Sequence, residues 1–268
     1  KVSGCACIGL ISSNLTLEGP IKKNKSPFML SDRRTFADLI VKAFTPKNKN
    51  STNYTFYDVN AKANFEVSKK DKLYFSLFKG LDNAKYVGLS SLQYGINFGN
   101  TTGTARWNHL FNNKLFSNTS FIYNDYHLSL TTTQDQYYAQ LYTGIKDVNF
   151  KTDFSYFPSS SHSIKAGINY SYSTLFPSTN SAKIPKNGNI NKPNLDSIQH
   201  IYSSLISFYV NDDITISEKV SASVGLRVPV FIKSDVQYLR YEPRVTIKYQ
   251  FDDATSIDRK STRVNDRH

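Results

Sequence analysis

Hydrophobic and polar side chains alternate along most of this chain. Between residues 240 and 251, Tyr, Pro, Val, Ile and Phe occupy every second position, and Arg, Glu, Thr, Lys and Gln stand between them. Successive side chains of a β-strand point to opposite faces, so such a segment has one apolar and one polar face. The same alternation recurs at residues 57–67, 164–172 and 220–230. The pattern predicts an all-β protein.

The alternating segments predict about eleven strands, most of them far longer than the ordinary strand of about 5–6 residues. A tilted strand that crosses a bilayer needs about 9–11 residues in lipid, so the length favours membrane strands. The residues Ile145 to Asp147 interrupt the alternation and suggest a bulge or a break. The expected strands are residues 6–19, 26–43, 53–67, 72–80, 91–110, 114–131, 137–157, 162–176, 200–216, 219–231 and 238–251.

The connections between these strands alternate in length. Short polar turns such as SKKDK, NNK and SEK alternate with longer links at 45–52, 81–90, 132–136, 177–199 and 232–237. Short turns on one side and long loops on the other are typical of outer-membrane barrels, which have short periplasmic turns and long extracellular loops. We therefore expect a transmembrane, antiparallel, up-and-down β-barrel.

Composition agrees with a barrel whose strands are apolar only at alternate positions. Mean hydropathy is −0.43, and no run approaches the roughly 18 apolar residues of a membrane helix. Aromatic residues make up 14% of the chain, which suits both strands and interfacial girdles. A soluble β-sandwich would also have one apolar face. The two are distinguished by whether that face forms one continuous belt about 25 Å tall with aromatic rims, or is buried between two sheets.

Charge and candidate chemistry narrow the function. The formal net charge is +12, but the lysines cluster in turns and the aromatic residues lie on apolar faces, so we expect no nucleic-acid partner. Four of the five histidines, at positions 109, 127, 162 and 200, are scattered without metal-ligand spacing. Cys5 and Cys7 are better explained as free thiols than as a disulfide. No nucleophile elbow or phosphate loop occurs. We expect no catalytic residues, no metal, no cofactor and no enzyme activity.

The last eleven residues, DRKSTRVNDRH, depart from the alternating pattern. They are similar to a translated sequencing adapter, so we expect residues 258–268 to be a non-native tail and residues 1–257 to be part of a barrel domain. The chain is then expected to be a piece of a longer protein.

The order of the segments resembles a known family. The stretches GLISSNLTLEGPIKKNKSPFMLSDRRTFADLI, YTFYDVNAKANFEVSKKDKLYFSLFKGLDN, TARWNHLFNNKLFSNTSFIYNDY, SFYVNDDITISEKVSASVGLRVPVF and YEPRVTIKYQF look like barrel strands of TonB-dependent outer-membrane receptors. Barrels of that kind have about 22 strands around a plugged lumen, so eleven strands would be about half. The resemblance covers most of residues 8–251.

What the resemblance implies is a receptor and transporter in the outer membrane, which takes up a metal chelate, an oligosaccharide or a peptide. Expected partners are outer-membrane lipid, the protein's own plug domain and, through an N-terminal region absent from this chain, the energy-coupling protein TonB. Without plug and TonB box, the piece itself is expected not to transport. The alternatives are a passive porin-like barrel and a soluble β-sandwich that binds a ligand.

Charged residues on the polar faces of the strands are the candidate ligand-facing or plug-facing groups. They are Asp58, Lys62, Arg227, Arg240, Glu242 and Arg244. The alternative is that they are wall residues paired across strands. Of the adjacent Arg33 and Arg34, only one can face the lumen if the strand is regular.

Overall fold

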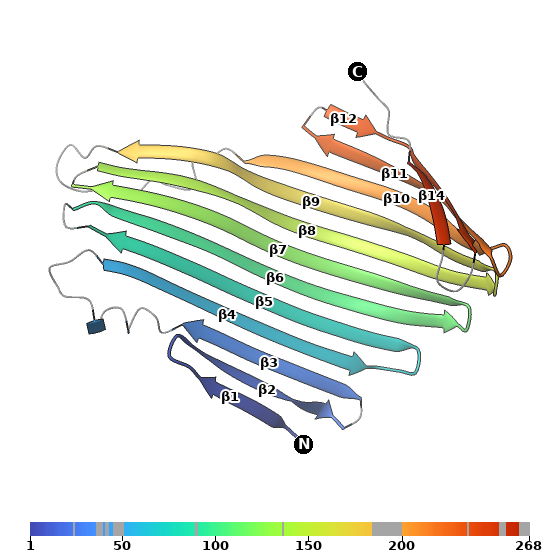
Figure 1. Cartoon of the computed structure of the whole chain (residues 1–268), viewed down its shortest axis with the longest axis horizontal. Coiled ribbons are helices and arrows are strands. Elements are labelled where there is room, and N and C mark those ends of the chain that lie inside the picture. Colours follow the sequence, from blue (N-terminus) through green and yellow to red (C-terminus); the bar gives the residue numbers. More distant parts are fainter. Residues whose placement is uncertain are drawn as a thin grey trace.

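The computed structural model contains one large antiparallel sheet (Figure 1). It describes residues 1–23, 25–35, 40, 43–44, 51–88, 91–135, 137–183, 200–234, 236–251 and 256–262. Among these residues, no helix is long and apolar enough to span a bilayer.

Fourteen strands make up this sheet in the described residues. Each strand from β1 to β11 pairs with the next strand in the chain, so this part of the sheet is an up-and-down meander. β13 then pairs with β11, β14 pairs with β13, and the short β12 also pairs with β11. The strands are β1 (Ser3–Ile8), β2 (Ser12–Lys22), β3 (Ser26–Thr35), β4 (Ser51–Glu66), β5 (Asp71–Val87), β6 (Gln93–Asn112), β7 (Leu115–Gln134), β8 (Tyr137–Ser159), β9 (His162–Lys183), β10 (Ile201–Thr215), β11 (Val220–Lys233), β12 (Val236–Leu239), β13 (Glu242–Gln250) and β14 (Ser256–Thr262).

The all-β meander is confirmed, but several predicted boundaries were wrong. The segment 6–19 is a hairpin of two strands, β1 and β2. The expected strand 26–43 ends at Thr35; of its remainder, residues 40, 43 and 44 are not strand, and 36–39 and 41–42 lie outside the described residues. The expected strand 238–251 is divided between β12 and β13.

The predicted alternation of short and long connections holds only in part. β5 continues through most of 81–90, and β7 and β8 leave only a tight connection between Gln134 and Tyr137. β11 and β12 likewise occupy much of 232–237. Of the links 45–52 and 177–199, residues 51–52 belong to β4 and residues 177–183 to β9, and residues 45–50 and 184–199 lie outside the described residues. The strands therefore include polar residues whose hydropathy predicts loops.

Apolar side chains on one face of the sheet align across nine strands. Since directly paired residues point to the same face, the strand register links the members of a row. One such row consists of Phe28, Ala63, Phe75, Ala105, Phe121, Phe150, Tyr170, Ile206 and Val230. Every member is apolar or aromatic. We call this face the outer face, and the band of rows around this one the apolar belt.

The apolar belt has the dimensions of a membrane-facing surface. On β4 it runs from Tyr57 to Phe65, which is about 27 Å along a strand that rises about 3.4 Å per residue. With the usual tilt of about 40°, that length corresponds to about 20 Å along the barrel axis. Many of its side chains remain open: Phe121 and Phe208 are 50% exposed. No second sheet covers this face within the described part of the chain. These features contradict the alternative of a β-sandwich.

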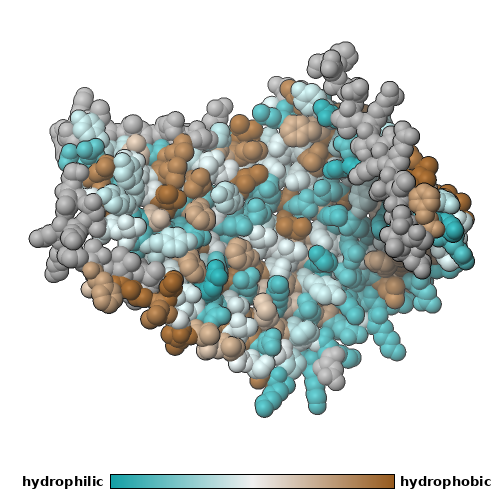
Figure 2. Space-filling view, viewed as in Figure 1, coloured by the Kyte–Doolittle hydropathy of each residue, from teal (hydrophilic) through white to brown (hydrophobic). Residues whose placement is uncertain are grey.

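The opposite face is polar at the same level and lies on the concave side. The row next to the one above holds Asn64, Tyr74, Arg106, Ser120, Lys151, Asn169 and Ser207. Figure 1 looks into the hollow towards which the C-terminal edge curls, with β14 in front of its neighbours. In the same view, hydrophilic side chains predominate over the right-hand part of this face, where the short turns lie (Figure 2). Ser207 is fully buried there, as expected where side chains crowd on a concave surface. We call this the inner face.

Candidate functional site

The two faces exchange polarity towards the end of the strands that carries the longer connections. On the inner face, one row there consists of Tyr54, Ala84, Ile96, Leu130 and Leu141. The adjacent outer row consists of Asn53, Lys85, Gly95, Thr131 and Gln140. The inner face is therefore apolar and the outer face polar at this level, the reverse of the arrangement in the belt.

This reversal also explains the irregular residues of β8. The strand is unbroken through Ile145, Lys146 and Asp147, so the predicted break was wrong. The aliphatic side chains of Leu141 and Ile145 point inward, whereas those of Val148, Phe150 and Phe154 point outward. The two register shifts of β8 against β9 lie instead between Tyr142 and Gly144 and between Tyr156 and Ser159.

Aromatic and aliphatic side chains gather on the inner face above the belt, and we call them the upper inner wall. Tyr94 is 47% exposed, which leaves much of its ring open to the hollow. The rings of Tyr86 and Tyr94 lie 6.2 Å apart, and those of Tyr54 and Phe56 lie 6.1 Å apart. The wall consists of Tyr54, Phe56, Tyr86, Tyr94, Ile96, Phe98, Tyr126, Leu128, Leu130, Leu141 and Ile145.

Charged groups lie beside these rings. The Arg33 guanidinium forms a 2.9 Å ion pair with Asp58 and lies 4.7 Å above the centre of the Phe56 ring. The Tyr54 hydroxyl donates a 2.6 Å hydrogen bond to Asp82. This bond, to a carboxylate, raises the pKa of the Tyr54 phenol. The upper inner wall can therefore stack on rings and also offer oriented polar groups.

Lower on the inner face, polar side chains hydrogen-bond to one another across strands. Asn149 donates to Asn169 at 2.8 Å, and Thr102 donates to Asn124 at 2.8 Å. Tyr209 donates to Asp153, which also pairs with Lys151 at 2.9 Å. This part of the hollow is a wet, hydrogen-bonded wall.

The structure places the sequence-predicted candidates on the inner face, but in two separate groups. Asp58 and Lys62 are on β4, whereas Arg227, Glu242 and Arg244 are on β11 and β13. Arg227 donates to Ser207 at 3.2 Å, and Arg244 pairs with Glu242 at 3.2 Å. Arg240, between β12 and β13, lines an open pocket of about 340 Å³ together with Arg227 and Glu242. Their suggested contacts with ligand or plug stay predictions.

The two adjacent arginines separate as expected. Arg33 is on the inner face, paired with Asp58, and Arg34 is on the outer face opposite Tyr57. Pro243 is also on the outer face, opposite Leu226 and one residue into β13. A proline is tolerated near the start of a strand because few ladder hydrogen bonds are lost there. Cys5 and Cys7 are free and exposed.

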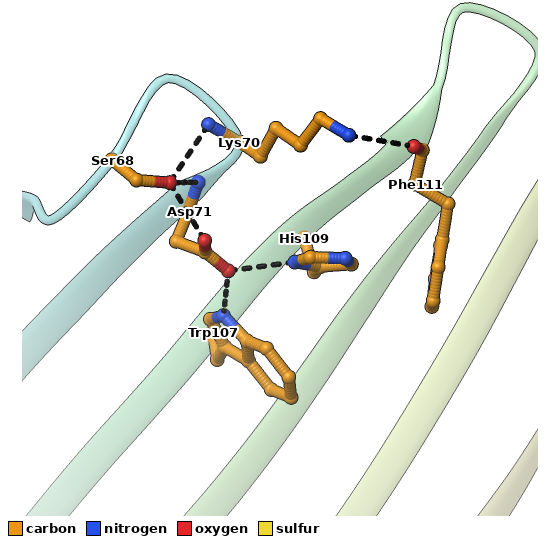
Figure 3. A network of polar contacts seen from close by, with 6 residues as sticks. All are labelled: Ser68, Lys70, Asp71, Trp107, His109 and Phe111. Atoms are coloured by element: carbon orange, nitrogen blue, oxygen red, sulfur yellow. Dashed lines mark hydrogen bonds and ion pairs between the residues drawn. The ribbon is translucent and has the colours of Figure 1, made fainter.

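A network of hydrogen bonds lies on the outer face, at the end of the strands that carries the short turns (Figure 3). Asp71 accepts hydrogen bonds from Ser68 at 2.7 Å and from the Trp107 indole at 3.0 Å, and lies 2.6 Å from His109 Nδ1. The His109 contact, followed by those of Ser68 and Trp107, lowers the pKa of Asp71 to about 2. The Trp107 ring borders the belt while its N–H reaches a carboxylate, as expected for an interfacial aromatic anchor.

Sequence reasoning missed the upper inner wall because it assigned the aromatic residues to the lipid side. The available signal was the change of phase within single strands, as at Ile145 to Val148. No group of three or more His, Cys, Asp or Glu side chains is placed to hold a metal ion in the residues that the structure covers.

Comparison with solved structures identifies the fold. The ferripyoverdine receptor of the outer membrane of Pseudomonas aeruginosa superposes with a TM-score of 0.69 at 13% identity, covering 97% of this chain and 41% of that one. The ferric preacinetobactin receptor BauA of Acinetobacter baumannii gives 0.66 at 11% identity, covering 96% and 46%. The alcaligin outer-membrane receptor FauA of Bordetella pertussis gives 0.66 at 10% identity, covering 97% and 42%. No family model and no curated protein sequence matches the chain.

The expected fold is therefore confirmed: these strands have the barrel architecture of TonB-dependent outer-membrane receptors. The chain spans less than half the length of these structures. The structural neighbours are receptors and not enzymes.

Proposed function

We propose that this chain forms part of the barrel wall of an outer-membrane receptor that imports a nutrient too large for passive pores. The observation that carries the proposal is the reversal of polarity on both faces at one level. Apolar residues face outward where lipid would lie and inward above that level, where an entering ligand would meet the wall.

The upper inner wall favours a ligand with flat or apolar groups and some charge. Rings such as Tyr94 and Phe98 offer stacking surfaces, and the Arg33–Asp58 pair and the Tyr54–Asp82 pair offer polar contacts. Among the three expected classes, a metal chelate with aromatic or amide groups fits this wall better than a plain oligosaccharide. Binding and orientation need no covalent chemistry, so the protein is proposed to be a transporter and not an enzyme. It requires no cofactor and no nucleic-acid partner.

The remaining parts of the assembly follow from the same proposal. The polar lower inner face, including Lys62, Arg227, Glu242 and Arg244, would contact a plug domain, and TonB would supply energy through that plug. The residues outside this chain would complete the barrel, because an open sheet leaves unpaired strand edges that lipid does not tolerate.

The first experiment is to express the intact gene product in a Gram-negative host and fractionate the membranes. We expect a protein in the outer membrane whose gel mobility changes on heating, as folded barrels show. A soluble product would overturn the proposal.

Ligand binding is then tested with a panel of ferric chelates, linear oligosaccharides and short peptides. We expect Phe98→Ala and Tyr94→Ala to weaken binding of a ferric chelate by about two- to tenfold per ring lost, since one aromatic contact contributes about 0.5–1.5 kcal/mol beyond its buried area. Phe121→Ala on the outer face is the matched control and should bind normally. Equal losses in all three variants would contradict an inner binding wall.

A further inference from the structure

A polar groove lies on the outer face, the side turned away from the lumen. It has a volume of about 410 Å³ and crosses β4 to β7 beyond the apolar belt. Its polar lining comes from amides, hydroxyls and one lysine, with outward register in every case. These residues are Asn53, Asn83, Lys85, Asn97, Ser129 and Thr131.

The groove begins close to the upper edge of the belt. On β5, Leu77 pairs with Ala61 at the midpoint of the belt segment of β4, and Asn83 lines the groove six positions further along β5. At about 3.4 Å per residue and the usual tilt, the rise along the barrel axis is about 15 Å. That places the groove at the level of lipid headgroups.

Glycines in β6 create the depression. A side chain at Gly99 would approach His127 Cε1 to 2.6 Å, and one at Gly95 would collide with the Thr131 hydroxyl. Neighbouring side chains therefore extend across β6 and meet in the groove: Asn97 donates to Asn83 and lies 3.2 Å from His127 Nε2.

One lining group has an unused acceptor. Asn53 Oδ1 is buried and has no hydrogen-bond partner within the described residues, although a buried carbonyl oxygen normally has one. A hydroxyl-bearing ligand in the groove would supply the missing donor.

Rings and cations lie on the same outer face between the groove and the belt. His127 stacks on Tyr142 with ring centres 6.3 Å apart, and Lys146 lies 5.5 Å from the centre of the Phe176 ring. Among the outward side chains of β5 to β8, Lys85 lines the groove, and Lys79 lies in the row of Val59 near the upper edge of the belt. In the same row Lys146 pairs with Asp125 at 3.6 Å, so the net positive charge comes from Lys79 and Lys85. The surface combines hydroxyl-binding amides with a positive charge, which suits a phosphorylated sugar.

We propose that this groove binds the phosphorylated saccharide headgroup of the glycolipid in the outer leaflet of the outer membrane. The inference rests on the proposed function, because only a protein in that membrane meets this lipid. It adds a binding site on the outside of the barrel that is distinct from the wall facing the imported ligand. Amides and ring faces would contact sugar, and lysines would contact phosphate.

The test uses the complete protein after its folding in the outer membrane has been confirmed. The protein is purified in detergent, and its binding is measured to vesicles containing lipopolysaccharide and to phosphatidylglycerol vesicles of equal surface charge. We expect preferential binding to lipopolysaccharide. Equal binding to both vesicles would show charge attraction alone and would overturn the headgroup site.

Two variants of the outer face and one control on the inner face locate the site. Lys79→Ala with Lys85→Ala should weaken lipopolysaccharide binding by about 25-fold, since each lysine near an anionic surface contributes about fivefold. Lys72→Ala with Lys248→Ala removes the same charge from the inner face and should leave binding unchanged. Asn53→Leu removes an amide whose Oδ1 accepts no hydrogen bond within the described residues, and should reduce the preference for lipopolysaccharide. If both lysine pairs behave alike, or if Asn53→Leu keeps the full preference, the groove is not the site.

The outcomes separate this inference from the proposed function. A protein that does not enter the outer membrane contradicts the proposed function. A protein that enters it and binds a nutrient, yet shows no preference for lipopolysaccharide, contradicts the glycolipid site only.

Discussion

Adjacent residues in the middle of β6 test which face meets lipid. Ala105 is on the outer face between Phe75 and Phe121, and Thr104 is on the inner face between Ser76 and Ile122. Both are small, half-buried residues of one strand, so an arginine at either position changes the same length of chain. Only the face differs.

Ala105→Arg places a charge within the apolar belt. An arginine at the bilayer midplane of a barrel costs about 2–4 kcal/mol, and less near the interfaces. Ala105 belongs to the apolar row that crosses nine strands, so we expect a cost in this range. That corresponds to about 30- to 700-fold in the folding equilibrium, since 1.4 kcal/mol is tenfold. Thr104→Arg should cost much less because its side chain enters the polar hollow. Ala105→Leu, which keeps the belt apolar, should fold like the parent.

The assay is reversible urea unfolding of the complete barrel in lipid vesicles, with the heat-dependent gel shift as a second readout. Greater loss in Thr104→Arg than in Ala105→Arg would mean that the faces are assigned the wrong way round. Equal losses in both arginine variants would mean that neither face meets lipid.

Three further predictions concern single contacts. The pKa of Asp71 is about 2, below its ordinary value of 3.8, so the hydrogen bonds to its carboxylate should stabilise the fold fully above about pH 5 and progressively less as the pH falls towards 2. Asp71→Asn should lack this acid-dependent component in unfolding measurements between pH 5 and pH 2. A double-mutant cycle on Arg33 and Asp58 should give a coupling energy below about 1 kcal/mol, because the Arg33 side chain is 56% exposed; a much larger value would contradict the geometry. Cys5 and Cys7 should each react with a maleimide in the unreduced isolated chain, giving two adducts by mass spectrometry, whereas a disulfide would give none.

Strand identity and the outer face could be predicted from the sequence because one physical rule governs both. Side chains alternate between two environments, so residues such as Val59, Ala61 and Ala63 reveal their face wherever the environments stay constant along a strand. The separation of Arg33 from Arg34 followed from the same rule.

The remaining strand boundaries depend on how each strand pairs with its neighbours, which the local sequence does not reveal. β1 and β2 were merged because no polar turn separates Ile8 from Ser12, and the sequence between them, GLI, is mostly apolar. The polar residues Asn83 and Lys85 predict a loop at the end of β5. This prediction is wrong, because both residues belong to the strand and line a groove on its outer face. A polar strand end and a polar loop have the same composition, and only pairing with β4 and β6 distinguishes them.

The segment 258–268 is a second case in which composition alone does not predict a strand. Residues 256–262 form β14 and pair with β13, although they show no apolar alternation; residues 263–268 lie outside the described part. Backbone pairing alone needs no apolar face, because each ladder hydrogen bond joins main-chain atoms. Pairing of this segment therefore does not test whether it belongs to the native chain, and its non-native origin stays a prediction.

The reversal of polarity explains why these strands are so long. A strand that only crossed lipid would need about 9–11 residues, whereas β6 to β9 each continue well beyond the belt. Beyond the belt the outer face meets water instead of lipid, so its side chains can be polar. The alternate, inward positions of the same strands can then be apolar. An apolar wall facing inward within the lipid zone would leave apolar residues on both faces of one strand and no polar lining for the hollow. Because the strands extend above the belt, the outward apolar surface and the inward apolar wall occupy different segments of the same strands. The upper inner wall and the outer groove therefore lie back to back on alternate residues of the same segments of β4 to β7, so a backbone shift in one surface would displace the other.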